Sequence, residues 1–95
     1  MIYNNVILRA KRAKDVEEIT SLLAIQAKVS LTEEGCERFE VYQSETDPQT
    51  FILMEWWDTQ EDLDRHKVTK QFVEIYMPKV VPLVKRHPHP SKRLA

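Results

Sequence analysis

The sequence predicts an α+β fold in which strands and helices follow one another in the order β-α-β-β-α-β. The chain has 95 residues, enough for one domain built around one core. Apolar and polar residues alternate in residues 2–13 and 36–45, and residues 50–57 form a short apolar run, as is typical of strands. Two segments with apolar residues at helical spacing separate these strands. This order is the ferredoxin-like pattern, in which the strands form one antiparallel sheet.

Composition excludes several classes of protein. One glycine rules out glycine-rich phosphate loops, and one cysteine rules out an internal disulfide and a cysteine-based zinc site. A formal charge of −1 gives no general attraction to nucleic acid. No segment approaches the roughly 20 apolar residues that span a bilayer, and the start of the chain lacks the pattern of a signal peptide. We therefore expect a cytoplasmic domain without nucleic-acid or membrane partners.

The first strand leads into a helix that we expect to begin after Asp15. Glu18 stands three positions further on, so the two acids predict a capping box. The helix should run to about Ser30, and Gly35 should end the following connection with a positive φ. The buried stripe of this helix is predicted from apolar residues at helical spacing: Val16, Ile19, Leu22, Leu23, Ala27 and Leu31.

Residues 36–45 and 50–57 should pair as an antiparallel hairpin, because a turn at 46–49 joins them. Asp47 and Pro48 favour that turn, since proline presets one φ and aspartate bonds to the following backbone. Residues 50–57 are apolar on both faces, with Phe51, Leu53 and Trp57 on one and Ile52, Met54 and Trp56 on the other. Two helices cover only one face of such a sheet. The sequence therefore predicts a homodimer that packs sheet against sheet.

Asp58 or Thr59 should cap the second helix, with Glu61 or Asp62 at the matching third position. Its stripe includes Leu63, His66 or Lys67, Lys70, Val73 and Tyr76, with Phe72 and Met77 beside it. Pro78 should interrupt this helix, and Pro82 limits residues 80–85 to a short extended piece outside the centre of the sheet. We place the domain at residues 1–86 and a mobile, basic C-terminal tail at residues 87–95.

Charge is unevenly distributed along the chain. Residues 32–64 contain eleven acids and one base, whereas residues 79–95 contain five bases and no acid. The basic segment either is solvated or docks on the acidic region of a partner copy. It has no interleaved aromatic residues of the kind that bind single-stranded nucleic acid.

The segment from Glu55 to His66 resembles the antibiotic biosynthesis monooxygenase superfamily. The shared features are a strand ending Glu55-Trp56-Trp57, a capped helix, and a histidine nine residues after Trp57. Glu34-Gly35-Cys36 leading to Phe39, the turn Asp47-Pro48, and Phe72 six residues after His66 add to the resemblance. It covers about residues 2–85 and is greatest for the quinol-monooxygenase branch. It implies a dimeric α+β barrel in which each protomer holds a cavity between its sheet and its helices.

Some members of this superfamily oxidise phenols or quinols with O2 and with no metal or flavin, and others degrade haem or have no demonstrated reaction. Cofactor-free oxygenation needs a substrate that gives an electron to O2 once it is deprotonated. The protein then supplies a base, a dry pocket and an oriented hydrogen bond. His66 is the only histidine before the basic tail, and histidine changes its charge near neutral pH. It is either that base or a structural histidine.

Glu55 and Trp57 are the other candidate catalytic residues. Glu55 interrupts an apolar strand, where a carboxylate is costly unless it is paired. It is either exposed at the strand end or bonded to His66, whose tautomer it would then fix. Trp57 is either core or a donor of its indole N–H to a phenolic oxygen. Trp56, on the opposite face, is read as core or dimer interface.

Four further residues are candidates for substrate binding: Asn4, Asn5, Phe72 and Tyr76. One of the two asparagines should point into the pocket, and Phe72, Tyr76 and Met77 either line it or belong to the core. The resemblance to haem-degrading relatives is weaker, because His66 and Tyr76 occupy the places of their tryptophan and histidine. Cys36 is expected to be a buried filler, and His87 with His89 lacks a third metal ligand.

The sequence therefore predicts a homodimer that binds a small aromatic molecule. The leading function is a cofactor-independent monooxygenase of a quinol or polyphenol, with His66 as base or orienting group. The alternatives are a dimer that binds a small hydrophobic ligand without turnover, and a haem-binding or haem-degrading enzyme.

Overall fold

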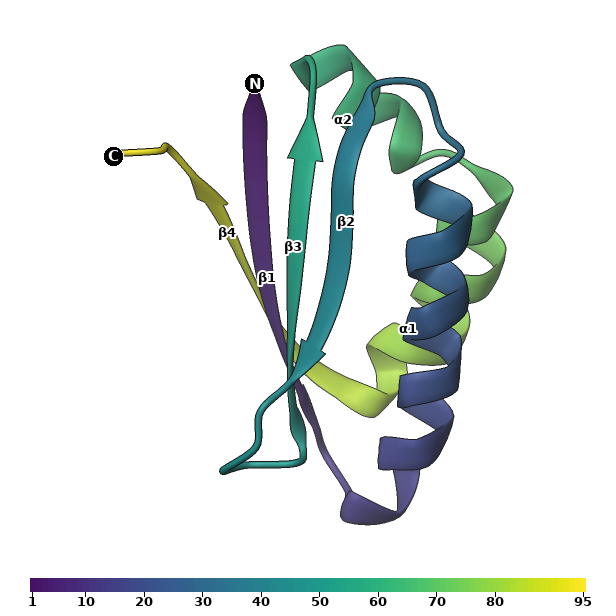
Figure 1. Ribbon diagram of the computed structural model, residues 1–95. Helices are drawn as coiled ribbons and strands as arrows, with labels where there is room; N and C mark the ends of the chain where they lie inside the picture. Colours follow the sequence, from purple (N-terminus) through teal and green to yellow (C-terminus); the bar gives the residue numbers. More distant parts are fainter.

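The computed structural model describes residues 1–95 and confirms the predicted fold class. The strands and longer helices are β1 (Ile2–Ala10), α1 (Val16–Ser30), β2 (Cys36–Gln43), β3 (Thr50–Trp57), α2 (Gln60–His66), η2 (Gln71–Val80) and β4 (Val84–Ser91). Two short 3-10 turns, η1 (Ala13–Asp15) and η3 (Val81–Leu83), join them. All helices lie on one face of the sheet, and the other face is uncovered (Figure 1). No helix combines the length and the apolar character needed to cross a membrane.

The sheet has the strand order β2-β3-β1-β4, and every neighbouring pair is antiparallel. The register places Val6 opposite Leu53 and Leu8 opposite Phe51. Because side chains alternate across a strand, these residues share the face that the helices cover. We call this the inner face of the sheet and the uncovered side the outer face.

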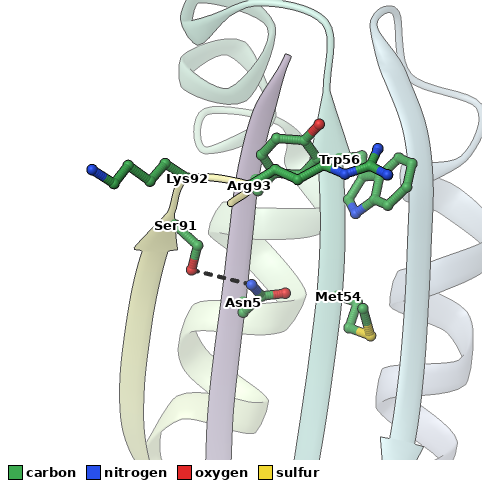
Figure 2. A pocket seen from close by; sticks show the side chains of 7 residues that line it. Asn5, Met54, Trp56, Ser91, Lys92 and Arg93 are labelled. Atoms are coloured by element: carbon green, nitrogen blue, oxygen red, sulfur yellow. Dashed lines mark hydrogen bonds between the residues drawn. The ribbon is translucent and has the colours of Figure 1, made fainter. Parts of the chain in front are cut away.

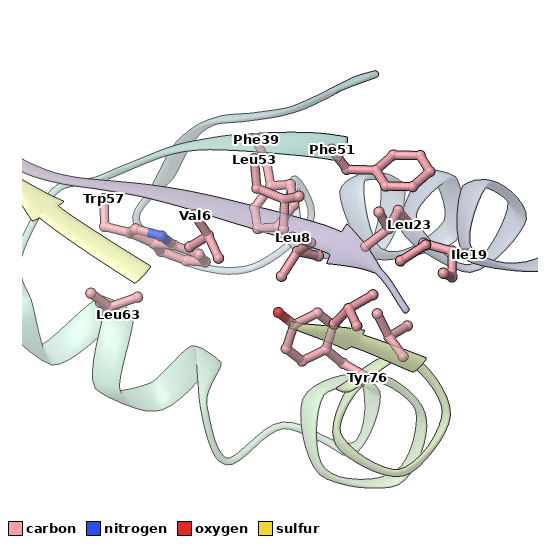
Figure 3. Close-up of a cluster of buried hydrophobic side chains, with 13 residues drawn as sticks. Val6, Leu8, Ile19, Leu23, Phe39, Phe51, Leu53, Trp57, Leu63 and Tyr76 are labelled. Atoms are coloured by element: carbon pink, nitrogen blue, oxygen red, sulfur yellow. The ribbon is translucent and has the colours of Figure 1, made fainter. Parts of the chain in front are cut away.

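The hydrophobic core lies between the inner face and the helices (Figure 3). Trp57 is fully buried at one end of β3, and Phe51 is 1% exposed at the other. Tyr76, on η2, closes the core from the helix side with 3% exposure. The remaining members are Val6, Leu8, Ala10, Ile19, Leu23, Phe39, Leu53, Leu63, Val80 and Val84.

Helix α1 has the predicted extent, but its N-terminal cap differs from the expected one. The side chain of Asp15 caps no backbone N–H and instead accepts a hydrogen bond from Arg12 Nε at 3.2 Å. The predicted capping box is therefore wrong, because a nearby guanidinium takes the carboxylate. The buried residues are Ile19, Leu23, Gln26 and Ser30, so one end of the buried stripe is polar.

The connection to β2 confirms that Gly35 takes a positive φ, at 80°. A Cβ at this position would collide with the side chain of Asp62 at the start of α2. In the hairpin turn, Asp47 accepts hydrogen bonds from Gln49 N (3.3 Å) and Thr50 Oγ1 (2.7 Å), as the sequence predicted. Gly35 therefore permits a close approach between the turn before β2 and the helix that carries His66.

Helix α2 is capped as predicted, and η2 continues further than expected. Thr59 Oγ1 accepts a hydrogen bond from Asp62 N (3.2 Å) and donates one to the Asp62 carboxylate (2.8 Å). After a break, η2 runs as a π-helix through Pro78 to Val80. Pro78 removes one backbone donor, but the helix continues for two residues beyond it, so the expectation that Pro78 interrupts the helix is wrong.

Strand β4 extends well beyond the short piece that we expected. It pairs with β1 from Val84 to Ser91, so the expected boundary at residue 86 falls inside a strand. Pro88 and Pro90 lie opposite Val6 and Asn4 in this ladder. A proline is tolerated in an edge strand where its nitrogen faces away from the neighbour. The expectation of a mobile tail from residue 87 is therefore wrong, and only residues 92–95 follow the sheet.

Candidate functional site

A small cavity lies between the inner face of the sheet and the helices. The elements β1, β2, β3, α1, α2, η2 and β4 all contribute to its wall, as does Lys67 after α2. The lining residues are Asn4, Gln26, Phe39, Leu53, Glu55, Leu63, His66, Lys67, Phe72, Tyr76 and Arg86. Its free volume is about 10 Å³, which holds at most one water molecule. We call it the interior cavity.

His66 is the last residue of α2 and is 3% exposed. Its ring lies against three aromatic rings, with centroid distances of 4.6 Å to Trp57, 5.2 Å to Phe72 and 5.9 Å to Phe39. Its Nδ1 lies 2.7 Å from Glu33 Oε1. A buried imidazole is thus held between aromatic walls and one carboxylate.

Glu55 is buried in the same cavity but does not bond to His66. Its Oε1 accepts a hydrogen bond of 3.1 Å from Trp57 Nε1. Burial raises the pKa of Glu55, while Trp57, the charge of His66 and the amide of Asn4 oppose this effect. Two expectations therefore change: Glu33, not Glu55, is the partner of His66, and the indole N–H of Trp57 is already engaged by Glu55.

The two asparagines of β1 lie on opposite faces of the sheet. Asn4 is 6% exposed and lines the interior cavity. Asn5 lies on the outer face, where its side chain donates to Ser91 Oγ at 3.1 Å (Figure 2). Only Asn4 thus points into the pocket, which agrees with the expectation that one of the pair would do so. The period of two in a strand requires this division.

Phe72 and Tyr76 line the interior cavity, together with a residue that sequence reasoning missed. Arg86, on β4, donates from Nε to Tyr76 Oη at 3.0 Å. Burial raises the pKa of Tyr76, and the positive charge of Arg86 opposes this. The alternation of Val84, Arg86 and Pro88 on one face was a signal for this residue, but the prolines were taken to end the strand.

A larger groove lies outside the interior cavity and shares part of its wall. It has a volume of about 410 Å³, in the range of pockets that hold small ligands. Its lining residues are Ile2, Asn4, Gln60, Leu63, Lys67, Phe72, Met77, Arg86, Pro88 and Pro90. No acid lines it, and neither Lys67 nor Arg86 forms a salt bridge. We call it the entrance groove.

A separate hollow of about 320 Å³ lies on the outer face of the sheet (Figure 2). Trp56 forms its floor, with the ring of Tyr3 at 5.4 Å and the guanidinium of Arg38 over it at 4.8 Å. The other lining residues are Asn5, Met54, Ser91, Lys92 and Arg93. Trp56 is thus on the outer face, and the sequence placed it correctly opposite to Trp57.

Other polar groups near the site form no metal cluster. No three side chains of His, Cys, Asp or Glu are arranged to hold a metal ion. Burial raises the pKa of the Cys36 thiol to about 12, and the charges of Glu33 and Glu55 add to this effect. His87 and His89 are exposed on β4.

Comparison with known proteins gives one family and many structural neighbours. A family model described as antibiotic biosynthesis monooxygenase matches residues 1–76. A Bacteroides thetaiotaomicron protein described as a possible oxidoreductase is 25% identical, with a TM-score of 0.89 over 97% of this chain and 96% of that chain. No curated protein matches the chain.

Two further solved structures bear the family's name. One, from Nitrosomonas europaea, bears it provisionally and is 23% identical, with a TM-score of 0.86 over 98% of this chain and 90% of that chain. The other is 15% identical, with a TM-score of 0.86 over 98% of this chain and 99% of that chain. At these identities the two structures support the fold alone.

Proposed function

Because the chain belongs to the antibiotic biosynthesis monooxygenase family, we propose that it oxidises a small phenol or quinol with O2 and without a cofactor. The observation that carries this proposal is His66, a buried imidazole that lines a small cavity together with the aromatic rings of Phe39, Phe72 and Tyr76. A base in such a place can deprotonate a phenolic oxygen while water is kept away. The match of residues 1–76 to the antibiotic biosynthesis monooxygenase family model supports the class of reaction.

The proposed reaction needs no external reductant. His66 takes a proton from a hydroquinone, and the resulting anion gives an electron to O2. Joining of the two radicals forms a C–O bond, and cleavage of the O–O bond then releases one oxygen atom as water. Hydroquinone and O2 thus give hydroxyquinone and water, so that the substrate supplies all the electrons.

The entrance groove supports a substrate that carries negative charge. A volume of about 410 Å³ suits a small aromatic ring system, whereas the interior cavity of about 10 Å³ admits no ring. Phe72 and Lys67 belong to both walls, so movement of these side chains would join the two spaces. The unpaired cations Lys67 and Arg86 favour a phenolate over a neutral phenol.

The closed state of the interior cavity also favours a second candidate, a protein that binds a small hydrophobic ligand without turnover. In that case His66, held by Glu33 and packed among three rings, is a structural residue. The entrance groove would then be the whole binding site.

Oxygen uptake with a panel of hydroquinones tests the proposal. The wild-type protein should consume O2 and form a hydroxyquinone. In His66→Ala and in the better-packed His66→Gln, the rate of oxygen uptake should fall about 10²–10⁴-fold, the usual contribution of a positioned base. His87→Ala, on the other side of the sheet, is the matched control and should keep the wild-type rate.

Urea unfolding of each variant distinguishes loss of the base from loss of the fold. Folded His66 variants that turn over at the wild-type rate would remove histidine from the mechanism. A wild-type protein that binds quinols in a fluorescence titration but consumes no O2 would support the binding protein. A Soret band on titration with haemin would instead favour the haem-binding alternative.

A further inference from the structure

His66 separates two cavities of different character. On one side lies the interior cavity, whose lining mixes aromatic residues such as Phe39 and Phe72 with polar ones. On the other lies a hollow of about 100 Å³, which we call the polar cavity. It contains no hydrophobic residue, and its lining is Glu33, Glu34, Asp62, Arg65, His66 and Thr69. Since His66 lines both, its ring connects the enclosed site with a polar route.

Glu33 determines which nitrogen of His66 faces which cavity. Its Oε1 lies 2.7 Å from Nδ1, and its side chain is 15% exposed. A carboxylate can only accept a hydrogen bond, so Nδ1 carries the proton. In the neutral imidazole Nε2 is then the nitrogen without a proton, which is the one that can act as a base.

The fold holds Glu33 in place through the turn between α1 and β2. Its N–H donates to Ser30 O at 3.0 Å, and its C=O accepts from Cys36 N at 3.2 Å. The same turn is tied to the start of the next helix, because Asp58 N donates to Gly35 O at 2.8 Å. The carboxylate and the imidazole therefore sit on two segments that the backbone fixes together.

Among the acids near this pair, Glu33 is the one that contacts His66, because the others have different partners. Arg65, on α2, pairs with Asp62 at 2.9 Å and with Glu34 at 3.4 Å. Glu55, on β3, is engaged by Trp57, and the Cys36 thiol on β2 is kept neutral at pH 7. Lys67 and Arg86 lie on the side of the interior cavity.

The second oxygen of Glu33 has no partner. Oε2 is buried and forms no hydrogen bond, although buried carboxylate oxygens are normally bonded. Such an oxygen is a vacant acceptor beside a carboxylate that already contacts the imidazole. Glu33 also lines the polar cavity, so its carboxylate lies between the imidazole and a polar space.

We propose that Glu33 and His66 act as one unit that takes a proton from the substrate and passes it to water through the polar cavity. The inference rests on the proposed function. His66 Nε2 removes the phenolic proton, and the Nδ1 proton moves to Glu33 Oε1. The carboxyl group then releases it to water, which leaves neutral His66 with its proton on Nε2. When the O–O bond breaks, Nε2 gives its proton to the leaving oxygen and Nδ1 takes one back from water through Glu33, so the resting tautomer is restored and no net proton is released. Glu33 is thus a positioning residue that does not touch the substrate.

The first test needs no substrate. In ¹⁵N NMR spectra of the wild-type imidazole, with His66→Gln used to assign the signal, neutral His66 should be a single Nδ1–H tautomer. Glu33→Gln keeps an oxygen acceptor and should preserve this tautomer, whereas Glu33→Ala should give a mixture. A wild-type ring protonated on Nε2, or an unchanged tautomer in Glu33→Ala, would overturn the inference.

The second test measures oxygen uptake with a hydroquinone. Glu33→Gln and Glu33→Ala should each lose about 10–100-fold in rate, as is common when the partner of a functional histidine is removed. Formate fits the polar cavity of Glu33→Ala and should restore much of the rate, but it should not restore Glu33→Gln, in which the amide fills the space. Glu61→Ala, which removes an exposed acid from α2, is the control and should match the wild type.

The two tests separate failure of this inference from failure of the proposed function. If Glu33→Ala takes up oxygen at the wild-type rate, the proton route is refuted while the monooxygenase stands. The same holds if Glu33→Ala is slow and formate does not restore its rate. A protein with the Nδ1–H tautomer that oxidises no quinol refutes the reaction, and the proton route with it, while the Glu33–His66 contact is confirmed.

Discussion

At the scale of single residues, the site is organised by two acids with different partners, the buried Glu55 and the partly exposed Glu33. Glu33 contacts His66, and Glu55 accepts from Trp57. Sequence reasoning found that a histidine, a carboxylate and a tryptophan would meet, because each stands out in its segment. It offered Glu55 as one possible partner of the histidine and did not consider Glu33, because nothing in the run Glu33-Glu34 shows which of the two acids turns inward.

Glu55 should make the stability of the protein depend on pH. Burial raises the pKa of Glu55 above the ordinary value of 4.5. Between these two pKa values the folded protein keeps a proton on Glu55 that the unfolded chain has released. Stability is therefore lost as the pH rises above about 4.5 toward the raised pKa. Urea unfolding between acid and neutral pH should show a steeper loss for the wild type than for Glu55→Gln.

Glu61→Gln, an exposed change, should follow the wild-type pH profile of stability. Equal slopes in the wild type and Glu55→Gln would mean that Glu55 is ionised in the folded protein across the whole range.

Cys36 should be unreactive in the folded protein. Burial and the nearby acids raise the pKa of its thiol from 9.0 to about 12, so the thiolate fraction at neutral pH falls about 1,000-fold. Iodoacetamide at pH 7.5 should label the unfolded protein in urea rapidly and the native protein on the timescale of unfolding. Native labelling at the rate of the unfolded chain would show an accessible thiolate.

At the scale of elements, the turn between α1 and β2 couples the site to the fold. Gly35→Ala puts a side chain at a φ of 80° and against Asp62. The backbone strain alone costs about 1–2 kcal/mol, and displacement of Asp62 disturbs the cap of α2. Urea unfolding should show a loss of at least that size, whereas the exposed neighbour Glu34→Ala should stay within about 0.5 kcal/mol of the wild type.

The number and order of the longer elements could be predicted from the sequence, because alternation and helical spacing record which face is buried. Three features could not. Arg12 competes for Asp15 across the short turn η1, which the apolar periodicity of the sequence does not describe. The π-helix passes through Pro78, and β4 passes through Pro88 and Pro90, because proline is excluded only where its missing N–H is needed. Arg86 was missed for the same reason.

At the scale of the whole molecule, the outer face of the sheet predicts a dimer. Tyr3 and Trp56 are half-buried there, and Ile7 and Ile52 are 38% and 36% exposed. Sedimentation equilibrium at micromolar protein should give about twice 11.3 kDa. Trp56→Glu should weaken the dimer, since it places a charge in an apolar interface.

Ile25→Glu, an equivalent change on the helix side where Ile25 is 49% exposed, should leave the dimer intact. A wild-type monomer with the same fold at this concentration would contradict the prediction.

The backbone of β4 pairs with β1 of the same chain, so residues 92–95 are the part of the basic end that lies beyond the sheet. Lys92 and Arg93 line the hollow around Trp56, on the outer face where we expect the second copy to pack. If they pair with acids of a second copy, the dimer of a chain that ends at Ser91 should dissociate more readily than the full-length dimer at low salt. At high salt the two dimers should dissociate equally. Equal dissociation at low salt would show that these four residues are solvated.

Pro88 and Pro90 have a consequence for growth of the sheet beyond one chain. They lie at alternate positions of an edge strand whose pairing with β1 is continuous, so both ring nitrogens face outward. An incoming strand would find no donor at these two places, which is how natural sheets resist aggregation through their edges. The two prolines that line the entrance groove thus also protect the β4 edge of the sheet against fibre formation. Replacing both prolines with threonine would restore the two donors, and the protein should then form thioflavin-positive fibres at concentrations where the wild type stays clear.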